Sequence, residues 1–252
     1  MDRTSASIAA TGFGLAAYPV VVERSFITRA EAVERALTTL RFFSNSPQNE
    51  APDATGYRGF YYHFLDMDTG RRAWRCELST IDSAFLLAGA LAAAVYFDRD
   101  TSEERELRML ADGLYRRADW QWAQAGGATV AHGWTPESGF LPSRWEGYSE
   151  ALVLYALGLG SPTYPLAEES YQAWTSTYRW ERVYDYEFLS AGPLFIHQLS
   201  HLGIDFRQIW DAFMREHETD YFENSRRATY IQQQYAIRNP HGFTGYGEHC
   251  WA

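Results

Sequence analysis

Cysteine is scarce in this sequence: the 252 residues contain only Cys76 and Cys250. These two side chains could form one bond, but two cysteines cannot build the disulfide framework on which many small secreted domains depend. A hydrophobic core must therefore hold the fold together. With 46% hydrophobic and 21% charged residues, the chain has the composition of a globular protein that buries such a core.

Positive charge is also in short supply. Lys and Arg number 22 against 32 Asp and Glu, which gives a net charge of -10. Nucleic acid and anionic membranes would both repel such a chain, so neither is expected as a partner. Aromatic residues, by contrast, make up 16% of the sequence. Their flat apolar faces and polar tips suit sugar rings, although a large core would use them equally well.

A long apolar run is missing as well. The uncharged apolar stretch from Ser83 to Phe97 is too short to cross a bilayer, which takes about 20 residues. Residues 1–3 precede an Ala-rich apolar run to Val22 that superficially resembles a signal peptide. Because this run contains two glycines and no clear Ala-x-Ala cleavage site follows it, we predict a helix there and no signal peptide.

Helical periodicity dominates the rest of the chain. Residues 28–43 begin with Thr28 and Glu31, a capping box, and continue with an apolar stripe at three- and four-residue spacing. Thr101 and Glu104 form the same pattern ahead of a second amphipathic helix. Charged residues lie between the apolar positions of this second helix, so one of its faces should meet solvent.

Other segments are apolar on every face and should be buried on every side. Residues 79–97 begin at Ser79, and their Ala and Gly residues would allow a neighbouring helix to approach closely. Residues 147–160 and the segment from Gly192 have the same character. The remaining segments are predicted as an amphipathic helix at 166–177, a broken and charged helical region at 206–238 that ends at Asn239-Pro240, and loops at 44–62 and 126–142.

Apolar helices therefore alternate with amphipathic ones. The inner and outer rings of an α/α toroid require this alternation, because inner helices are covered on both sides. An irregular helical bundle would show the same periodicity. No strand alternation strong enough for a sheet and no low-complexity linker are visible, so the sequence predicts an all-α fold with residues 1–252 in one domain.

Acidic residues lie where the chain enters the first apolar helix. Glu77 precedes Ser79, and Asp82 follows it by three residues. At this spacing Asp82 could cap the helix and complement its dipole, or the two carboxylates could act in catalysis.

The second helix entry combines two carboxylates with side chains that suit a sugar. Glu150 directly precedes an apolar run, an environment that raises a carboxyl pKa as a general acid requires, but it could also be a partner of the helix dipole. Glu146, four residues earlier, could be solvated or paired with Arg144. With Trp145 and Tyr148, these side chains form a candidate substrate-binding group.

A third polar group contains two histidines. His197, His201 and Asp205 are spaced to share one face of a helix, where they could bind a metal, contact sugar or make structural hydrogen bonds. The glutamate that follows the first histidine of a zinc-protease motif is missing. We predict that the protein needs no metal and no cofactor, and that packing and hydrogen bonding explain this group.

A Gly-rich loop closes the chain. It carries Tyr246, Glu248 and Trp251, and a carboxylate on a flexible loop among aromatic rings suits a ligand site.

Several of these segments together resemble the bacterial glucoamylase-like domain, in the same order and spacing along nearly the whole chain. They are GFGLAAYPVVVERSFITRAEA, GFYYHFLDMDTGRRAW, ELSTIDSAFLLAGAL, WEGYSEALVLYALGLGSP, GPLFIHQLSHLGIDFR, YFENSRRATY and GYGEHCW. That family includes endo-β-1,2-glucanases of glycoside hydrolase family 144 and is distantly related to the cyclising domain of cyclic β-1,2-glucan synthases. The resemblance implies an (α/α)6 toroid with a sugar cleft at one mouth.

The resemblance also implies roles for the carboxylates. Glu150 corresponds to the glutamate of the family's Tyr-Asn-Glu-type motif, with Ser149 in place of the usual Asn, and would be the catalytic acid. Glu77 and Asp82 fall in the family's other acidic motif, beside the cleft. By analogy with the cyclising domain, Glu248 would face the acid across that cleft.

The activity implied is that of a glycoside hydrolase that cleaves β-1,2-glucan or a related β-glucan, as a monomer without membrane insertion, in the periplasm or outside the cell. Family domains are longer, so the chain is expected to be truncated at both ends and the toroid incomplete. The alternative is a non-catalytic carbohydrate-binding protein or an inactive fragment. A polysaccharide lyase is disfavoured because its substrates are usually polyanions, which a charge of -10 repels.

Overall fold

The computed structural model describes residues 4–251, which form two compact units. The first unit contains residues 4–145 and 153–171, and the second contains residues 146–152 and 172–251. Within 4–251, no helix is both long and apolar enough to cross a membrane.

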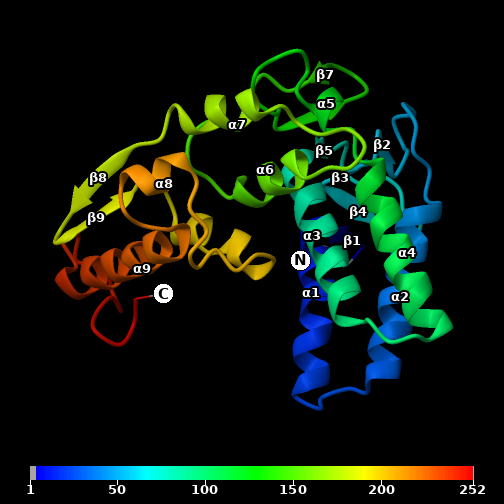
Figure 1. Cartoon of the computed structure of the whole chain (residues 1–252), viewed down its shortest axis with the longest axis horizontal. Coiled ribbons are helices and arrows are strands. Elements are labelled where there is room, and N and C mark those ends of the chain that lie inside the picture. Colours follow the sequence, from blue (N-terminus) through cyan, green and yellow to red (C-terminus); the bar gives the residue numbers. More distant parts are fainter. Residues whose placement is uncertain (1–3, 252) are drawn as a thin grey trace. The chain divides into compact units, whose positions relative to one another are not determined.

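Helices make up most of the first unit (Figure 1). They are α1 (Ile8–Glu23), α2 (Arg29–Asn45), α3 (Thr80–Tyr96), α4 (Ser102–Arg117) and α5 (Trp120–Ala123), together with α6 (Leu152–Leu159) and α7 (Glu168–Thr175), in which the chain passes between the units. The predicted helices near the N-terminus, at 28–43, at 79–97 and after Thr101 are confirmed, and the capping box of Thr28 and Glu31 opens α2.

The close approach predicted for the apolar helix α3 is also confirmed, and its partner is α1 (Figure 1). Gly12 of α1 and Gly89 of α3 lie at the crossing, where a methyl group on either glycine would collide with the backbone of the other helix. The two helix axes can approach this closely because neither glycine carries a side chain. Ten of the 17 residues of α3 are buried and most of the others are half-buried, while Val95 near its C-terminal end is exposed.

Helices predominate as expected, but a strictly all-α fold is not confirmed, because the loops predicted at 44–62 and 126–142 contain strands. The strands of the first unit are β1 (Ser5–Ser7), β2 (Gly56–Tyr57), β3 (Phe60–Tyr62), β4 (Phe64–Asp66), β5 (Leu78–Ser79), β6 (Gly133–Thr135) and β7 (Gly139–Phe140). They form an antiparallel sheet in the order β2-β3-β5-β6-β7, and β1 pairs with β4. These strands are two or three residues long, too short for the alternation over four to eight residues that reveals a strand in a sequence.

The apolar helix predicted at 147–160 begins later than expected, at Leu152. Gly147 has a φ of 74°, in the left-handed region that a right-handed helix excludes, and its N–H bonds to the carbonyl of Trp174. Residues 146–151 therefore form turns ahead of α6, and the two glutamates of this segment are not helical.

The second unit is built from a hairpin and short helices. Its elements are β8 (Trp180–Val183), β9 (Tyr186–Leu189), the 3-10 turns η1 (Leu194–His197) and η2 (Leu199–Leu202), α8 (Ala212–Glu216) and α9 (Tyr221–Arg238). The predicted broken helical region is confirmed, and α9 ends with Asn239 in the left-handed conformation. The α-helix predicted from Gly192 is wrong, since two 3-10 turns replace it. A 3-10 turn places every third residue on one face, so its apolar pattern resembles that of an α-helix in the sequence.

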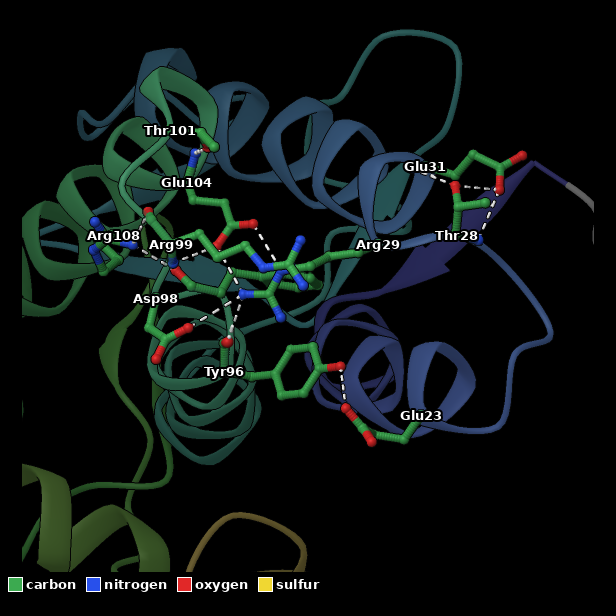
Figure 2. Close-up of polar contacts among 11 residues, drawn as sticks. Glu23, Thr28, Arg29, Glu31, Tyr96, Asp98, Arg99, Thr101, Glu104 and Arg108 are labelled. Carbon is green, nitrogen blue, oxygen red and sulfur yellow. Dashed lines mark hydrogen bonds and ion pairs between the residues drawn. The ribbon is translucent and has the colours of Figure 1, made fainter.

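Arg29 ties the ends of several helices together in the first unit (Figure 2). Its guanidinium donates two hydrogen bonds of 2.8 Å to Glu104 of α4 and one of 2.9 Å to the carbonyl of Tyr96 of α3. Thr101 caps the N-terminus of α4, but the carboxylate of Glu104 turns to Arg29 and to the N–H of Arg99 rather than back to Thr101. The second predicted capping box is therefore only half formed: Thr101 accepts from the N–H of Glu104, but the Glu104 carboxylate pairs with Arg29 instead.

Candidate active site

The first helix entry is also the centre of the sheet. The central strand β5 runs directly into α3, so Glu77 stands just before the strand and Asp82 in the first helical turn. The Ser79 hydroxyl accepts a hydrogen bond of 3.2 Å from the Asp82 N–H and donates one of 2.5 Å to the Asp82 carboxylate. The predicted capping is thus confirmed, and it holds the Asp82 side chain in one position.

His63, which the sequence reading missed, lies between these two carboxylates. It sits at the bend between β3 and β4, and the pairing of β3 with β5 places it opposite Glu77, whose carbonyl accepts a 3.0 Å hydrogen bond from the His63 N–H. The ring nitrogen Nδ1 is 2.8 Å from Glu77 Oε1, and Nε2 is 3.5 Å from Asp82 Oδ1. Both nitrogens of the ring are therefore directed at carboxylates.

The pKa values of the two carboxyl groups in this cluster shift in opposite directions. The hydrogen bond with His63 lowers the pKa of Glu77. Burial lowers the pKa of His63, but Glu77 and Asp82 outweigh it and raise that pKa overall. Burial also raises the pKa of Asp82, and the opposing hydrogen bond from Ser79 offsets only part of this effect. Glu77 is thus the more firmly ionised carboxyl, and Asp82 accepts a proton more readily than an ordinary aspartate.

Aromatic side chains border the cluster. The ring of Phe64 stacks on His63 with centroids 4.0 Å apart, and Trp74 packs against Phe64 at 5.1 Å. Trp74 is 61% exposed, so a large flat ring meets solvent next to Phe64, which in turn stacks on His63. Gly133 of β6 lies against Glu77, where a methyl group would crowd the Glu77 side chain at 3.1 Å.

The aromatic residues predicted at the second helix entry are largely buried. Trp145 is 9% exposed, stacks on His132 with centroids 3.9 Å apart, and donates from its indole N–H to Thr80 Oγ1 at 3.0 Å. Tyr148 is 8% exposed. The guanidinium of Arg144 donates to the side chain of Thr129 at 3.1 Å and to nearby backbone carbonyls. The structure thus gives Arg144 and Trp145 packing and hydrogen-bonding roles within the first unit.

Glu150 lies in the turn before α6, half-buried, and its backbone carbonyl accepts a 2.9 Å hydrogen bond from Ser200. The residues that follow it, Ala151 to Tyr155, are at most 4% exposed, so the predicted apolar surroundings are present on that side. Glu146 is exposed, in the irregular segment ahead of that turn. Because neither glutamate is in the helix, the predicted spacing of one helical turn between them does not exist.

The histidine group of the second unit does not share one helical face. His197 and His201 belong to separate 3-10 turns, and Asp205 lies beyond both. His197 is 2% exposed and packs against Tyr148 with ring centroids 5.2 Å apart, and burial lowers its pKa to about 4. Asp205 pairs with Arg207 at 2.6 Å instead. Over residues 4–251, no three or more His, Cys, Asp and Glu side chains are grouped so that they could hold a metal ion.

The C-terminal loop is open to solvent. Tyr246 is 40% exposed, and Glu248 is exposed in the turn closed by the bridge between Gly247 and Cys250. The carbonyl of the half-buried Trp251 accepts a 3.5 Å hydrogen bond from Gln232 of α9.

Comparisons with known proteins extend this description. Residues 142–252 match the family model described as "Putative glucoamylase". A curated relative from Parabacteroides distasonis, named exo beta-1,2-glucooligosaccharide sophorohydrolase (non-reducing end), is 29% identical over 275 residues, which cover 96% of this chain and 36% of that protein. This chain therefore spans about a third of the curated relative's length.

Solved structures match the chain closely. A crystal structure titled a putative glucoamylase from Bacteroides uniformis is 32% identical, with a TM-score of 0.90, and the match covers 100% of this chain and 62% of that one. The crystal structure of a beta-1,2-glucanase from Parabacteroides distasonis is 26% identical, with a TM-score of 0.88, covering 98% of this chain and 38% of that one.

Proposed function

We propose, because the chain resembles the glucoamylase-like family along nearly its whole length, that it is a glycoside hydrolase that cleaves β-1,2-glucan. The names of the curated relative and of the glucanase from the same organism support this linkage. Because the chain spans 36% of the curated relative, the activity of the whole protein is part of the proposal.

The cluster of Glu77, His63 and Asp82 is the observation of this structure that carries the proposal. Glycoside hydrolysis needs two carboxyl groups whose proton affinities differ, one to supply a proton and one to act on water or on the sugar. Asp82 and Glu77 are the two candidates here for the carboxylate that acts on water or on the sugar, and their proton affinities differ, because burial raises the pKa of Asp82 while His63 lowers that of Glu77. The exposed ring of Trp74, which packs on Phe64 next to His63, suits the apolar face of a sugar ring.

We assign the general acid to Glu150. It would protonate the glycosidic oxygen of the departing sugar, while a second carboxylate takes a proton from the water that attacks the anomeric carbon or attacks that carbon itself. The half-buried position of Glu150 ahead of buried apolar residues supports the role of acid. Shielding from water favours Asp82 or Glu77 over the exposed Glu248 as the second carboxylate.

We further propose that both units belong to one (α/α)6 toroid that acts as a monomer. Solved structures of the same fold cover 97% to 100% of the chain with TM-scores between 0.84 and 0.90, which supports a single domain. Predicted sugar contacts from Tyr246 and Trp251 belong to the same proposal.

Glu150→Gln tests the assignment of the acid. This change keeps the shape of the side chain but removes its proton, so release of reducing sugar from β-1,2-glucan oligosaccharides should fall by about two to four orders of magnitude while oligosaccharide affinity persists. Glu181→Gln, an exposed position on β8 of the same unit, is the matched control. Near-normal turnover in Glu150→Gln would remove Glu150 from the mechanism. Affinity without turnover in the unaltered chain would make it a carbohydrate-binding protein.

A further inference from the structure

We propose that His63 is a positioning residue that, held by Glu77, aims Asp82 into the reaction, so that Asp82 and not Glu77 is the reacting carboxyl of this pair. This inference rests on the proposed function and adds a residue and a division of labour to it.

The contacts of the His63 ring carry the argument. Three separate segments meet here: His63 comes from the bend between β3 and β4, Glu77 from the position just before β5, and Asp82 from the first turn of α3. The ring is 2.8 Å from Glu77 and 3.5 Å from Asp82, and the stacked ring of Phe64 fixes its plane. The shorter contact makes Glu77 the anchor of the ring, and Asp82, which Ser79 holds, meets the other ring nitrogen at the longer distance.

Asp82 is also the better shielded carboxyl. The exposed fraction of its side chain is 14%, against 32% for Glu77, and Ser79 holds one of its oxygens. The other oxygen faces His63 Nε2. A carboxylate held on one side by Ser79 and faced by an imidazole 3.5 Å away keeps a defined orientation, which a catalytic base or nucleophile needs.

The other charged and titratable groups around the cluster do not compete for His63. Arg72 acts on Glu77 from a distance, but its guanidinium pairs with Glu137 at 2.8 Å. The thiol of Cys76, whose pKa burial raises, contacts the backbone of Phe64. From α1, the backbone N–H of Ile8 bonds to the His63 carbonyl, and the neighbouring β1 carries no charge. Glu77 and Asp82 are therefore the charged groups that raise the pKa of the His63 imidazole.

The structural coupling can be tested without activity. In the unaltered chain, ¹⁵N NMR of the ring should show His63 titrating above its ordinary pKa of about 6.5, and Glu77→Gln should lower that pKa by about one unit or more. Asp68→Asn removes an exposed carboxyl from the turn after β4 and should leave the titration unchanged. An identical His63 titration in the unaltered chain and in Glu77→Gln would overturn the inference, whether or not the chain hydrolyses glucan.

Hydrolysis of β-1,2-glucan oligosaccharides tests the division of labour. Asp82→Asn should lower kcat by about 10²-fold or more, whereas His63→Gln and Glu77→Gln should each lower kcat by about tenfold, leave KM nearly unchanged and shift the pH profile of kcat. A loss in Glu77→Gln as large as that in Asp82→Asn would make Glu77 the reacting carboxyl and overturn the inference. An unshifted pH profile in His63→Gln would overturn it as well. If the unaltered chain hydrolyses nothing, the proposed function and the role of Asp82 fail together, while the titration still reports the coupling.

Discussion

At the residue scale, exposure divides the aromatic side chains of this protein into two kinds. Trp145 and Tyr148 stand next to acidic residues in the sequence, but their rings are at most 9% exposed and fill the core. Trp74 lies beside the Glu77 and Asp82 cluster through Phe64 and leaves most of its ring in solvent. A sugar can stack only on a ring face that it can reach, so Trp74 is the better candidate for substrate contact.

Replacement of Trp74 by Ala should therefore weaken oligosaccharide binding with little effect on folding. Loss of one aromatic face is expected to raise Kd for β-1,2-glucan oligosaccharides about three- to tenfold, as titration calorimetry can measure. Met67→Ala removes a comparably exposed apolar side chain from the same unit and should leave Kd unchanged. Equal affinities of the unaltered chain and the Trp74 variant would exclude this ring from the binding site.

At the element scale, the crossing of α1 and α3 depends on two glycines. Gly89→Ala should destabilise the first unit by about 1–3 kcal/mol, because the added methyl must push apart two packed backbones. Gly113→Ala in α4 is the matched control, since no atom lies within 4 Å of its new methyl group. That change should stabilise the protein by about 0.5–1 kcal/mol through helix propensity. Urea unfolding measures the free energy of unfolding of both variants. An unchanged free energy of unfolding in Gly89→Ala would show that the two helices can move apart without cost.

A second element-scale prediction concerns the two ion pairs between α2 and α4. Arg29 and Glu104 have side chains that are 16% and 5% exposed, whereas those of Arg41 and Glu106 are 51% and 33% exposed. Glu104→Gln should cost about 1–3 kcal/mol because a mostly buried guanidinium loses its principal counter-charge and keeps only the 3.3 Å pair with the exposed Asp98. Glu106→Gln should cost less than about 1 kcal/mol. Similar losses in the two variants would contradict the difference in burial.

The pH dependence of the Arg29 pair follows from its pKa shift. The hydrogen bond from Arg29 lowers the pKa of Glu104 below its ordinary 4.5, so the unfolded chain takes up this proton first as the pH falls. The stabilisation is complete above the unfolded pKa and disappears as the pH falls through the folded one. Unfolding measured between pH 6 and pH 3 should thus show a smaller acid loss in Glu104→Gln than in the unaltered protein.

At the scale of the whole molecule, the comparisons offer two kinds of substrate, because relatives carry the names of both glucoamylases and beta-1,2-glucanases. A ligand that binds the folded state stabilises it, by about 2.7 kcal/mol at a concentration 100 times Kd. β-1,2-Glucan oligosaccharides at that level should raise Tm by about 5–10 °C for a chain of this size, and maltooligosaccharides should leave it unchanged. A shift with the α-1,4-linked sugar alone would reverse the proposed specificity.

Local sequence accounted for those features that are decided within one helix or one turn. The capping of α2 by Thr28 and of α3 by Ser79, the burial of α3 and the end of α9 at Asn239 all follow from residues a few positions apart. The predicted start of α6 was wrong because it depends on a residue distant in the sequence. A left-handed Gly147 bonded to Trp174 displaced it, and periodicity cannot reveal such a contact.

The sequence by itself determined the helices α1 to α4, the caps of α2 and α3, and the small residues that let α3 approach a neighbouring helix. The tertiary structure decided the rest. Strands of two or three residues carry too little pattern to be read, yet their pairing brings His63, fourteen positions before Glu77, into hydrogen-bond contact with it. Which aromatic ring is exposed and which carboxyl is shielded depend on neighbours distant in the chain, and only the packing of those neighbours fixes burial and pKa.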